Sequence, residues 1–295
     1  MKRRVPGHPR LELHELVQTC GSIVRLFLIV FTIGLACGAR ADEIAVDLEL
    51  VLAVDVSLSM DADEQKLQRD GYVEAFRDPD VVRAIRSNGH GRIGVTYIEW
   101  AGSQTQKVTM GWTLVDGEAA ARGFADKLAA QPILRAQRTS ISGALLFAAQ
   151  FFEGSGFKGK RRVIDVSGDG PNNDGVPVTP VRDQLVANGI TINGLPILLK
   201  APSGWFDIEN LDEYYEDCVI GGFAAFSIAV RTREEFARAI KRKLLLEIAE
   251  TRPGLPGGTG RVIKTQARAP AKPRVSCLIG EERWDNYMGG RRREF

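Results

Sequence analysis

Three oxygen-bearing side chains, Asp55, Ser57 and Ser59, stand at alternating positions directly after a run of apolar residues. Such a run predicts a buried strand, and open α/β sheets bind their ligands just beyond the carboxyl ends of their strands. A tight turn at this point would aim one carboxylate and two hydroxyl groups at the same spot. Hard oxygen donors without His or Cys suit Mg²⁺, Mn²⁺ or Ca²⁺ rather than Zn²⁺. The stretch therefore predicts a divalent-cation site, with Mg²⁺ as the first candidate.

The apolar run, residues 46–54, is nearly continuous, as a strand covered on both faces requires. Strand-like and helix-like segments then alternate along the chain, which predicts an α/β fold with a doubly wound, mostly parallel, Rossmann-like sheet. One antiparallel edge strand is expected at 106–114, because the connection that precedes it is short. The expected strands are 46–54, 93–100, 106–114, 161–167, 190–197 and 223–230, and the expected helices are 61–87 (with a break near 78–79), 116–129, 139–152, 177–188 and 233–250.

Two further oxygen donors are expected at the same edge of the sheet. Thr139 opens one predicted helix, and Asp169 follows the strand predicted at 161–167. Because the carboxyl ends of parallel strands meet at one edge, we expect both residues to lie close to the turn after residue 54. The alternative is that these side chains only cap helices and hold no metal, since Ser, Thr and Asp are good N-caps.

With these five positions in register, residues 45–250 resemble a von Willebrand factor type A (vWA) domain. In that family an Asp-x-Ser-x-Ser motif, a distant Thr and a later Asp form the metal-ion-dependent adhesion site (MIDAS). Within the family the chain resembles an exported bacterial group of unknown function (DUF1194-like), partly through the stretch 214–222. The resemblance implies that a cation in this site leaves one coordination position open for an acidic group of a partner protein.

The resemblance also implies a role for each residue. Ser57 and Ser59 would bind the metal through their hydroxyl groups, and Thr139 would bind it directly or through water. Asp55 and Asp169 would act mostly through water and orient the other ligands. Apart from the resemblance, Asn172 and Asp174 could support the ligands from behind, but a solvated turn is the favoured interpretation of this stretch.

The sequence offers few residues that are suited to catalysis. Beyond residue 41 the only histidine is His90, in a turn between glycines, so a Ser-His-Asp triad or a His-ligated zinc site is not expected. Magnesium-assisted phosphate hydrolysis is conceivable, because a cation in an oxygen site can activate water. No residue stands out as its general base, and we expect that the protein is not an enzyme.

Both ends of the chain differ from its middle. Residues 1–41 combine basic residues, a short apolar block at 26–35 and Ala39-Arg40-Ala41, which together predict a secretory signal peptide cut after Ala41. A retained anchor and a lipoprotein attached at Cys37 are the alternatives. The mature chain is then exported, periplasmic or secreted, without a transmembrane span. Residues 251–295 are basic and rich in Pro and Gly, which predicts a flexible tail, docked at most near Trp284.

Residues 42–250 carry 31 acidic and 23 basic side chains, a net charge of −8, which suits a cation site and argues against nucleic acid as a partner. Two cysteines remain after export, Cys218 and Cys277, and they either pair or stay separate.

The function expected from the sequence is an exported, divalent-metal-dependent protein-binding module that grips an acidic side chain of another protein. The alternatives are a structural vWA-like scaffold that makes its contacts through a predicted insertion at 198–222, and, less favoured, a metal-assisted hydrolase.

Overall fold

The structure, a computed structural model, describes residues 42–200, 207–249, 263–264 and 273–291 of the 295-residue chain. Contacts divide the chain into two units, Met1–Asp42 and Glu43–Phe295, and the described helices and strands all lie in the second. The predicted signal peptide lies outside the described residues. Of the helices that are described, none is long and apolar enough to cross a membrane.

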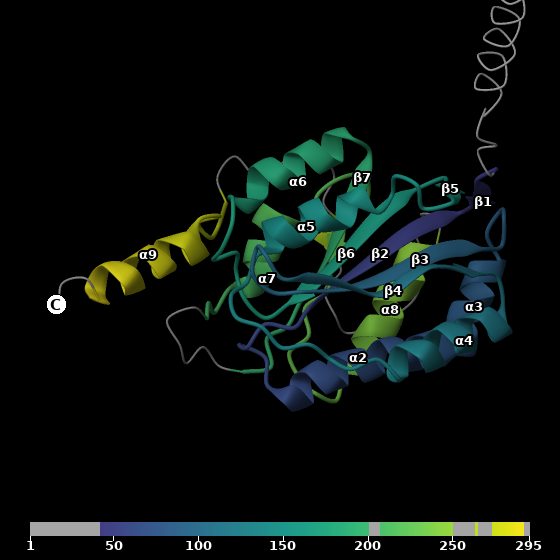
Figure 1. The fold of residues 1–295 in the computed structure, drawn as a ribbon, viewed down its shortest axis with the longest axis horizontal. Helices are drawn as coiled ribbons and strands as arrows, with labels where there is room; N and C mark the ends of the chain where they lie inside the picture. The colour runs from purple at the N-terminus through teal and green to yellow at the C-terminus, as the bar shows by residue number, and fades with distance from the viewer. Residues whose placement is uncertain (1–41, 201–206, 250–262, 265–272, 292–295) are drawn as a thin grey trace, which may run out of the picture. The chain divides into compact units, whose positions relative to one another are not determined.

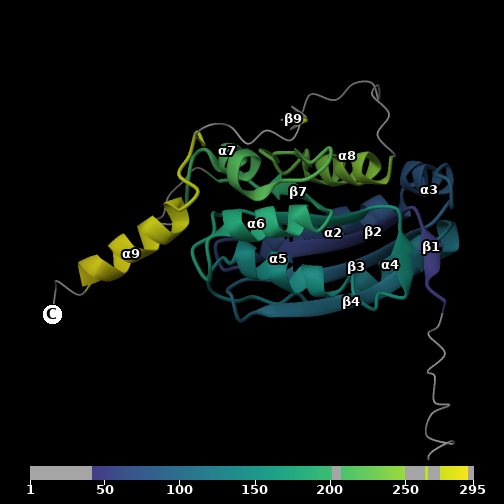
Figure 2. The same cartoon turned by 90° about the horizontal axis from the view of Figure 1, so that it is seen from above.

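A central sheet and a separate strand pair make up the described β-structure. The strands are β1 (Ile44–Val46), β2 (Leu48–Asp55), β3 (Ile93–Trp100), β4 (Gln106–Val115), β5 (Phe157–Gly159), β6 (Arg162–Gly168), β7 (Ile190–Pro196), β8 (Phe226–Ser227) and β9 (Ile263–Lys264). The sheet has the order β4-β3-β2-β6-β7-β8-β9, and β1 pairs with β5. The inner strands are parallel, whereas β4 and β9 are antiparallel and lie at opposite edges (Figure 2). The doubly wound, mostly parallel α/β fold is thereby confirmed.

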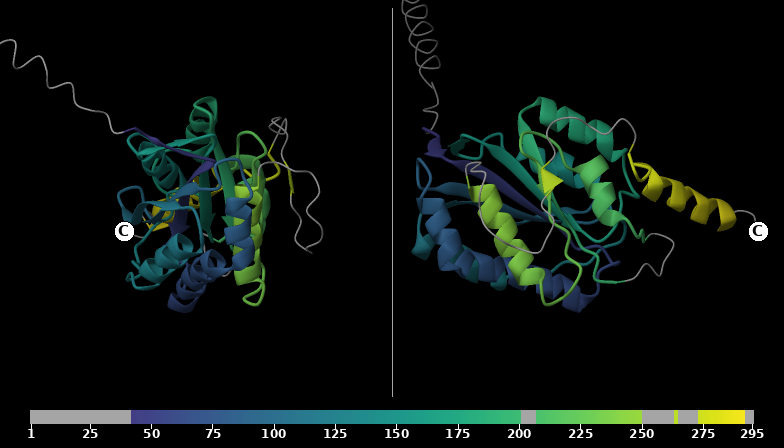
Figure 3. Two further views of the ribbon diagram at one scale, coloured as in Figure 1. Left: turned by 90° about the vertical axis from the view of Figure 1, so that its right-hand side faces the viewer. Right: turned by 180° about the vertical axis from the view of Figure 1, so that it is seen from behind.

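Helices cover both faces of this sheet (Figures 1 and 3). They are α2 (Ala62–Arg77), α3 (Pro79–Arg86), α4 (Glu118–Ala129), α5 (Ile141–Gln150), α6 (Val178–Ala187), α7 (Leu211–Tyr214), the π-helical turn η1 (Tyr215–Val219), α8 (Phe236–Ile248) and α9 (Ile279–Arg291). One face packs against α2, α3, α4 and α8, and the other against α5, α6, α7 and η1.

The apolar run that forms β2 supplies both hydrophobic cores. Leu48, Leu50 and Leu52 point into the core beneath α2 and α8. Val51 and Ala53 point into the core beneath α5 and α6. Successive side chains of a strand point to opposite faces, so a strand with helices on both sides must be apolar at nearly every position. β2 is therefore held rigidly in the centre of the sheet, and the turn that follows it has a fixed starting point.

The predicted strand at 223–230 is much shorter in the structure. Only Phe226–Ser227 pairs as β8, with an isolated bridge at Val230. The chain enters through Gly222 and Ala224, whose positive φ angles of 100° and 55° are incompatible with an extended strand. The sequence also predicts one antiparallel edge strand, whereas the sheet has two, because β9 comes from residues that were predicted to be tail.

The predicted insertion and tail both contribute to the core. Residues 201–206 of the insertion lie outside the described residues, but Tyr214, Tyr215 and Cys218 are buried against the sheet. Cys218 forms a disulfide with Cys277, which resolves the open question of their pairing. Residues around Cys277 are thus not a free tail, because a covalent bond and the contacts described below fix them to the domain.

Candidate metal centre

The turn after β2 is shaped by the first carboxylate of the motif. The backbone N–H of Ser57 donates to Asp55 Oδ1 at 2.7 Å. Asp and Asn side chains stabilise turns in this way, by accepting from the backbone two residues further on. On the other side of the turn, Leu58 N–H donates to the carbonyl of Ala136 at 2.9 Å. The two contacts fix the backbone between Asp55 and Ser59, so both hydroxyl groups of the motif have defined positions.

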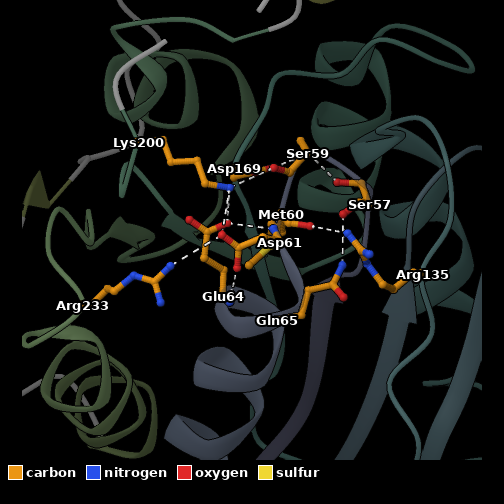
Figure 4. A network of polar contacts seen from close by, with 10 residues as sticks. All are labelled: Ser57, Ser59, Met60, Asp61, Glu64, Gln65, Arg135, Asp169, Lys200 and Arg233. Carbon is orange, nitrogen blue, oxygen red and sulfur yellow. Dashed lines mark hydrogen bonds and ion pairs between the residues drawn. The ribbon is translucent and has the colours of Figure 1, made fainter. Parts of the chain in front are cut away.

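Three of the five predicted ligands form one continuous chain of oxygen atoms (Figure 4). Ser57 Oγ lies 2.8 Å from Ser59 Oγ. Ser59 Oγ donates to Asp169 Oδ1 at 2.6 Å. Asp169 reaches this position because β6 pairs with β2 in parallel, so that both strands end at the same edge. The sequence therefore predicted correctly that these residues would meet, although 110 positions separate Ser59 from Asp169.

The spacing of these oxygens fits a small divalent cation. Neighbouring ligands of an octahedral Mg²⁺ at 2.0–2.1 Å are about 3 Å apart, close to the two distances above. Asp55 is fully buried, and its Oδ2 atom has no hydrogen-bond partner among the described residues, although buried carboxylates normally have one. The described residues hold no group of three or more His, Cys, Asp and Glu that could bind a metal, so a cation here would depend on the serine hydroxyls.

Thr139 lies near the other residues, across the loop that follows Asp169. A Cβ built on Gly170 would be 3.8 Å from Thr139 Oγ1. The Thr139 backbone N–H donates to Asn173 Oδ1 at 3.0 Å, and Asn173 N–H donates back to the Thr139 carbonyl at 2.8 Å. These reciprocal bonds join the Thr139 loop to the Asp169 loop. The structure records no direct bond between Thr139 and the serines, so Thr139 borders the oxygen chain without belonging to it.

The two carboxylates of the site carry perturbed pKa values. Burial raises the pKa of Asp169 from its ordinary 3.8 to about 6, against the lowering effect of the hydrogen bond from Ser59. Burial raises the pKa of Asp55 well above 3.8, and the nearby Asp169 adds to the shift. Desolvation and like charges disfavour the ionised form, whereas a bound cation would favour it. In the metal-free protein both carboxyl groups are therefore easier to protonate than usual, and cation binding is expected to release protons.

A basic side chain at the rim was not found from the sequence. Lys200 Nζ lies 3.3 Å from the Ser59 carbonyl oxygen and 2.5 Å from Glu64 Oε2 (Figure 4). It also lies 3.5 Å from Asp61 Oδ2, as does the guanidinium of Arg233. Its position after β7 could have indicated this, because β7 ends at the same sheet edge as β6. Asp61 itself caps α2, where its Oδ1 accepts from the backbone N–H of Glu64 at 2.8 Å.

Asn172 and Asp174 both accept hydrogen bonds from the backbone of neighbouring elements. Asn172 is fully buried, and its Oδ1 accepts from the backbone N–H of Ser142 at 3.0 Å. Asp174 Oδ2 accepts from the backbone N–H of Ser103 at 2.8 Å. Both residues thus tie the loop after Asp169 to neighbouring elements of the sheet edge, and neither contacts the oxygen chain directly.

The fold, with the Asp-x-Ser-x-Ser turn and its distant Asp at one sheet edge, is vWA-like. Comparison with protein families leads to a more specific assignment. The chain belongs to the family described as protein of unknown function (DUF1194), whose model matches residues 45–252. Among curated proteins, none matches this sequence.

Several solved structures share the fold. Proximal thread matrix protein 1 from the mussel byssus, with a zinc-occupied MIDAS motif, is 15% identical with a TM-score of 0.47 over 70% of this chain and 49% of that one. A von Willebrand factor type A protein from Catenulispora acidiphila is 13% identical with a TM-score of 0.47, over 69% and 43%. The pilus adhesin SpaC from Lactobacillus rhamnosus GG is 10% identical with a TM-score of 0.50, over 69% and 30%. This chain therefore spans about half the length of the first of these proteins, and the likeness concerns the fold alone.

Proposed function

We propose that this protein is an exported, divalent-cation-dependent binding module that grips an acidic side chain of a partner protein. Ser57, Ser59 and Asp169 would hold the cation, with Thr139 completing the set from the neighbouring loop. Asp55 would stand behind the serines and hold their turn. Mg²⁺ is the first candidate, and Mn²⁺ and Ca²⁺ have the same preference for oxygen ligands.

The observation that carries this proposal is the oxygen chain Ser57–Ser59–Asp169 beside the unpartnered Asp55 Oδ2. Two of its three members are neutral hydroxyl groups. When bound, a cation with few directly coordinated charges would supply an electrophilic position that favours a carboxylate from outside.

The rim of the site favours the same kind of partner. Arg135 precedes Ala136, whose carbonyl contacts the turn after β2. The Arg135 Nη2 atom donates to the Met60 carbonyl at 3.0 Å. Lys200 lies on the side of α2 and is half exposed. Positive side chains near a binding site increase the rate at which an acidic partner arrives, and here Glu64 and Asp61 offset part of the charge of Lys200. Fold similarity to a pilus adhesin is compatible with this proposal.

Binding, rather than catalysis, is the activity we propose for the site. His90, the only histidine beyond residue 41, lies in the turn after α3, where its backbone N–H donates to Asp47. None of the contacts described for the oxygen chain supplies a general base. Export is supported by the Cys218–Cys277 disulfide, because such bonds persist in oxidising compartments.

Calorimetric titration with Mg²⁺ and Mn²⁺ of the protein from residue 42 onward tests this function. The wild type is expected to bind one cation saturably, and Ser59→Ala to bind at least about tenfold more weakly, because a ligand oxygen is removed. Ser87→Ala is the matched control, because Ser87 only caps α3 through the Ala84 carbonyl. A wild type that binds neither metal, or a Ser59→Ala protein that binds as the wild type does, would contradict the proposal.

A further inference from the structure

The described part of the predicted tail reaches back to the candidate metal centre. Residues 273–284, here called the C-terminal clasp, include the first turns of α9 and lie beyond the residues that the family model matches. Among its contacts with the domain, one is with η1 and two are with the loops that carry Thr139 and Asp169. Arg283 also donates to the Asp207 carbonyl.

The first contact anchors the clasp to η1. Cys277 is bonded to Cys218, which is buried within η1. Arg274 adds a bidentate interaction, because its Nε and Nη2 donate to the Asp217 carboxylate at 3.0 and 2.9 Å. Its Nη2 also donates to Glu216 at 2.6 Å. Planar two-point contacts between guanidinium and carboxylate groups are geometrically specific. The start of the clasp is therefore held both covalently and by charge.

The second contact joins the clasp to the loop that follows Asp169. The buried side chain of Asn172 donates to Glu281 Oε1 at 2.8 Å. At the same place Gly280 packs against the backbone, and a Cβ added there would lie 1.9 Å from the Asn172 carbonyl oxygen. No real Cβ contact is that short, so only glycine permits α9 to approach this closely. Asn172 thereby connects α9 to the N-terminus of α5, where it accepts from Ser142.

The third contact joins the clasp to the loop that carries Thr139. The guanidinium of Arg138, the residue before Thr139, stacks on the ring of Trp284 at 3.2 Å from its centroid. Arg138 has a φ angle of 74°, in the left-handed region that non-glycine residues adopt only when their surroundings hold them there. The stacking on Trp284 is one such restraint.

We propose that the C-terminal clasp is a positioning element of the metal centre: it holds the Thr139 and Asp169 loops in the arrangement that binds the cation. This inference rests on the proposed function, and it adds that cation affinity depends on residues more than 100 positions after Asp169. Residues that orient metal ligands without touching the metal commonly change the affinity by about 10- to 100-fold when they are replaced.

Two glycines of α9 provide a matched test in the full-length protein. Gly280→Ala pushes the helix away from Asn172, whereas Gly289→Ala adds its methyl group in open space. We expect Gly280→Ala to bind Mg²⁺ at least about tenfold more weakly. In the metal-free protein the same variant should exchange its amide hydrogens faster over residues 138–145 and 169–176. Gly289→Ala should match the wild type in both measurements.

The two readouts separate this inference from the proposed function. If the wild type binds no Mg²⁺, the proposed function is wrong, and hydrogen exchange of the metal-free proteins still shows whether the clasp restrains the loops. If Gly280→Ala melts at a lower temperature but keeps wild-type affinity and loop exchange, the clasp has a purely structural role and the inference is overturned. Should Gly280→Ala fail to fold, Trp284→Ala serves instead, with the same two measurements and the same expected changes.

Discussion

Lys243→Met is expected to destabilise the protein by about 3–5 kcal/mol, because it leaves two buried carboxyl groups without their cation. Lys243 lies on α8, fully buried, with its Nζ 2.6 Å from Asp165 Oδ1 and 2.5 Å from Glu247 Oε1. Burial raises the pKa of Glu247 to about 7 and also raises that of Asp165. Burial alone would lower the pKa of Lys243, but the two carboxylates raise it, so the lysine stays charged. Urea denaturation of the variant measures the loss.

Lys241→Met, two residues away on the same helix, is the control for this prediction. Lys241 is partly exposed and lies 2.8 Å from both Asp78 and Asp80. Partly exposed ion pairs contribute at most about 1 kcal/mol, so this variant should unfold almost as the wild type does. If the two variants lost equal stability, or if Lys243→Met lost less than about 1 kcal/mol, the ion pairs of Lys243 with Asp165 and Glu247 would not stabilise the fold in the way that their burial indicates.

The affinity for Mg²⁺ is expected to fall between pH 7 and pH 5, and the protonation of Asp169 by itself accounts for about tenfold of this change. In the metal-free protein Asp169 has a pKa of about 6, so it is mostly ionised at pH 7 and mostly protonated at pH 5. A carboxylate that coordinates a cation must first lose its proton, so protons compete with the metal below pH 6. The raised pKa of Asp55 acts in the same direction. Calorimetry at several pH values should also detect proton release on binding.

The folding stability of the metal-free protein should change with pH in the direction opposite to the Mg²⁺ affinity, because it is highest at low pH. Because the folded pKa of Asp169 lies above the ordinary 3.8, this group stabilises the fold fully below about pH 4 and loses that contribution as pH rises through about 6. Asp169→Asn removes the titrating group, so the variant should lack this part of the pH dependence. Unchanged Mg²⁺ affinity between pH 5 and pH 7 would contradict the assignment of Asp169 to the cation site.

Most of the fold and the core of the site could be predicted from the sequence, because the signals are local. The apolar run of β2 implies a covered parallel strand, and the position of Asp55, Ser57 and Ser59 follows directly from it. The approach of Asp169 then follows from the parallel pairing of β2 with β6. Residues at the carboxyl ends of adjacent parallel strands lie at the same edge of the sheet. Asp169 could therefore be placed next to Ser57 and Ser59 without knowledge of how the helices pack.

Residues whose environment depends on distant packing could not be placed in this way. The turn around Asn172 has the composition of a solvated loop, and its burial arises partly from Gly280 and Glu281, more than 100 residues later. Asp165 is a charged residue in the middle of β6, and only the fold brings Lys243 to it. No periodicity or motif reports such partners, since each contact depends on how complete elements pack together.

Crystals of the protein grown or soaked with Mn²⁺ provide the most direct test, because manganese is located by its anomalous scattering. We expect one strong peak within about 2.0–2.3 Å of the Ser57 and Ser59 hydroxyl oxygens, beside Asp169, with a coordination position open to solvent or to a neighbouring carboxylate. Manganese bound elsewhere, or no peak at the end of β2 under saturating conditions, would show that this oxygen cluster is not a cation-binding site.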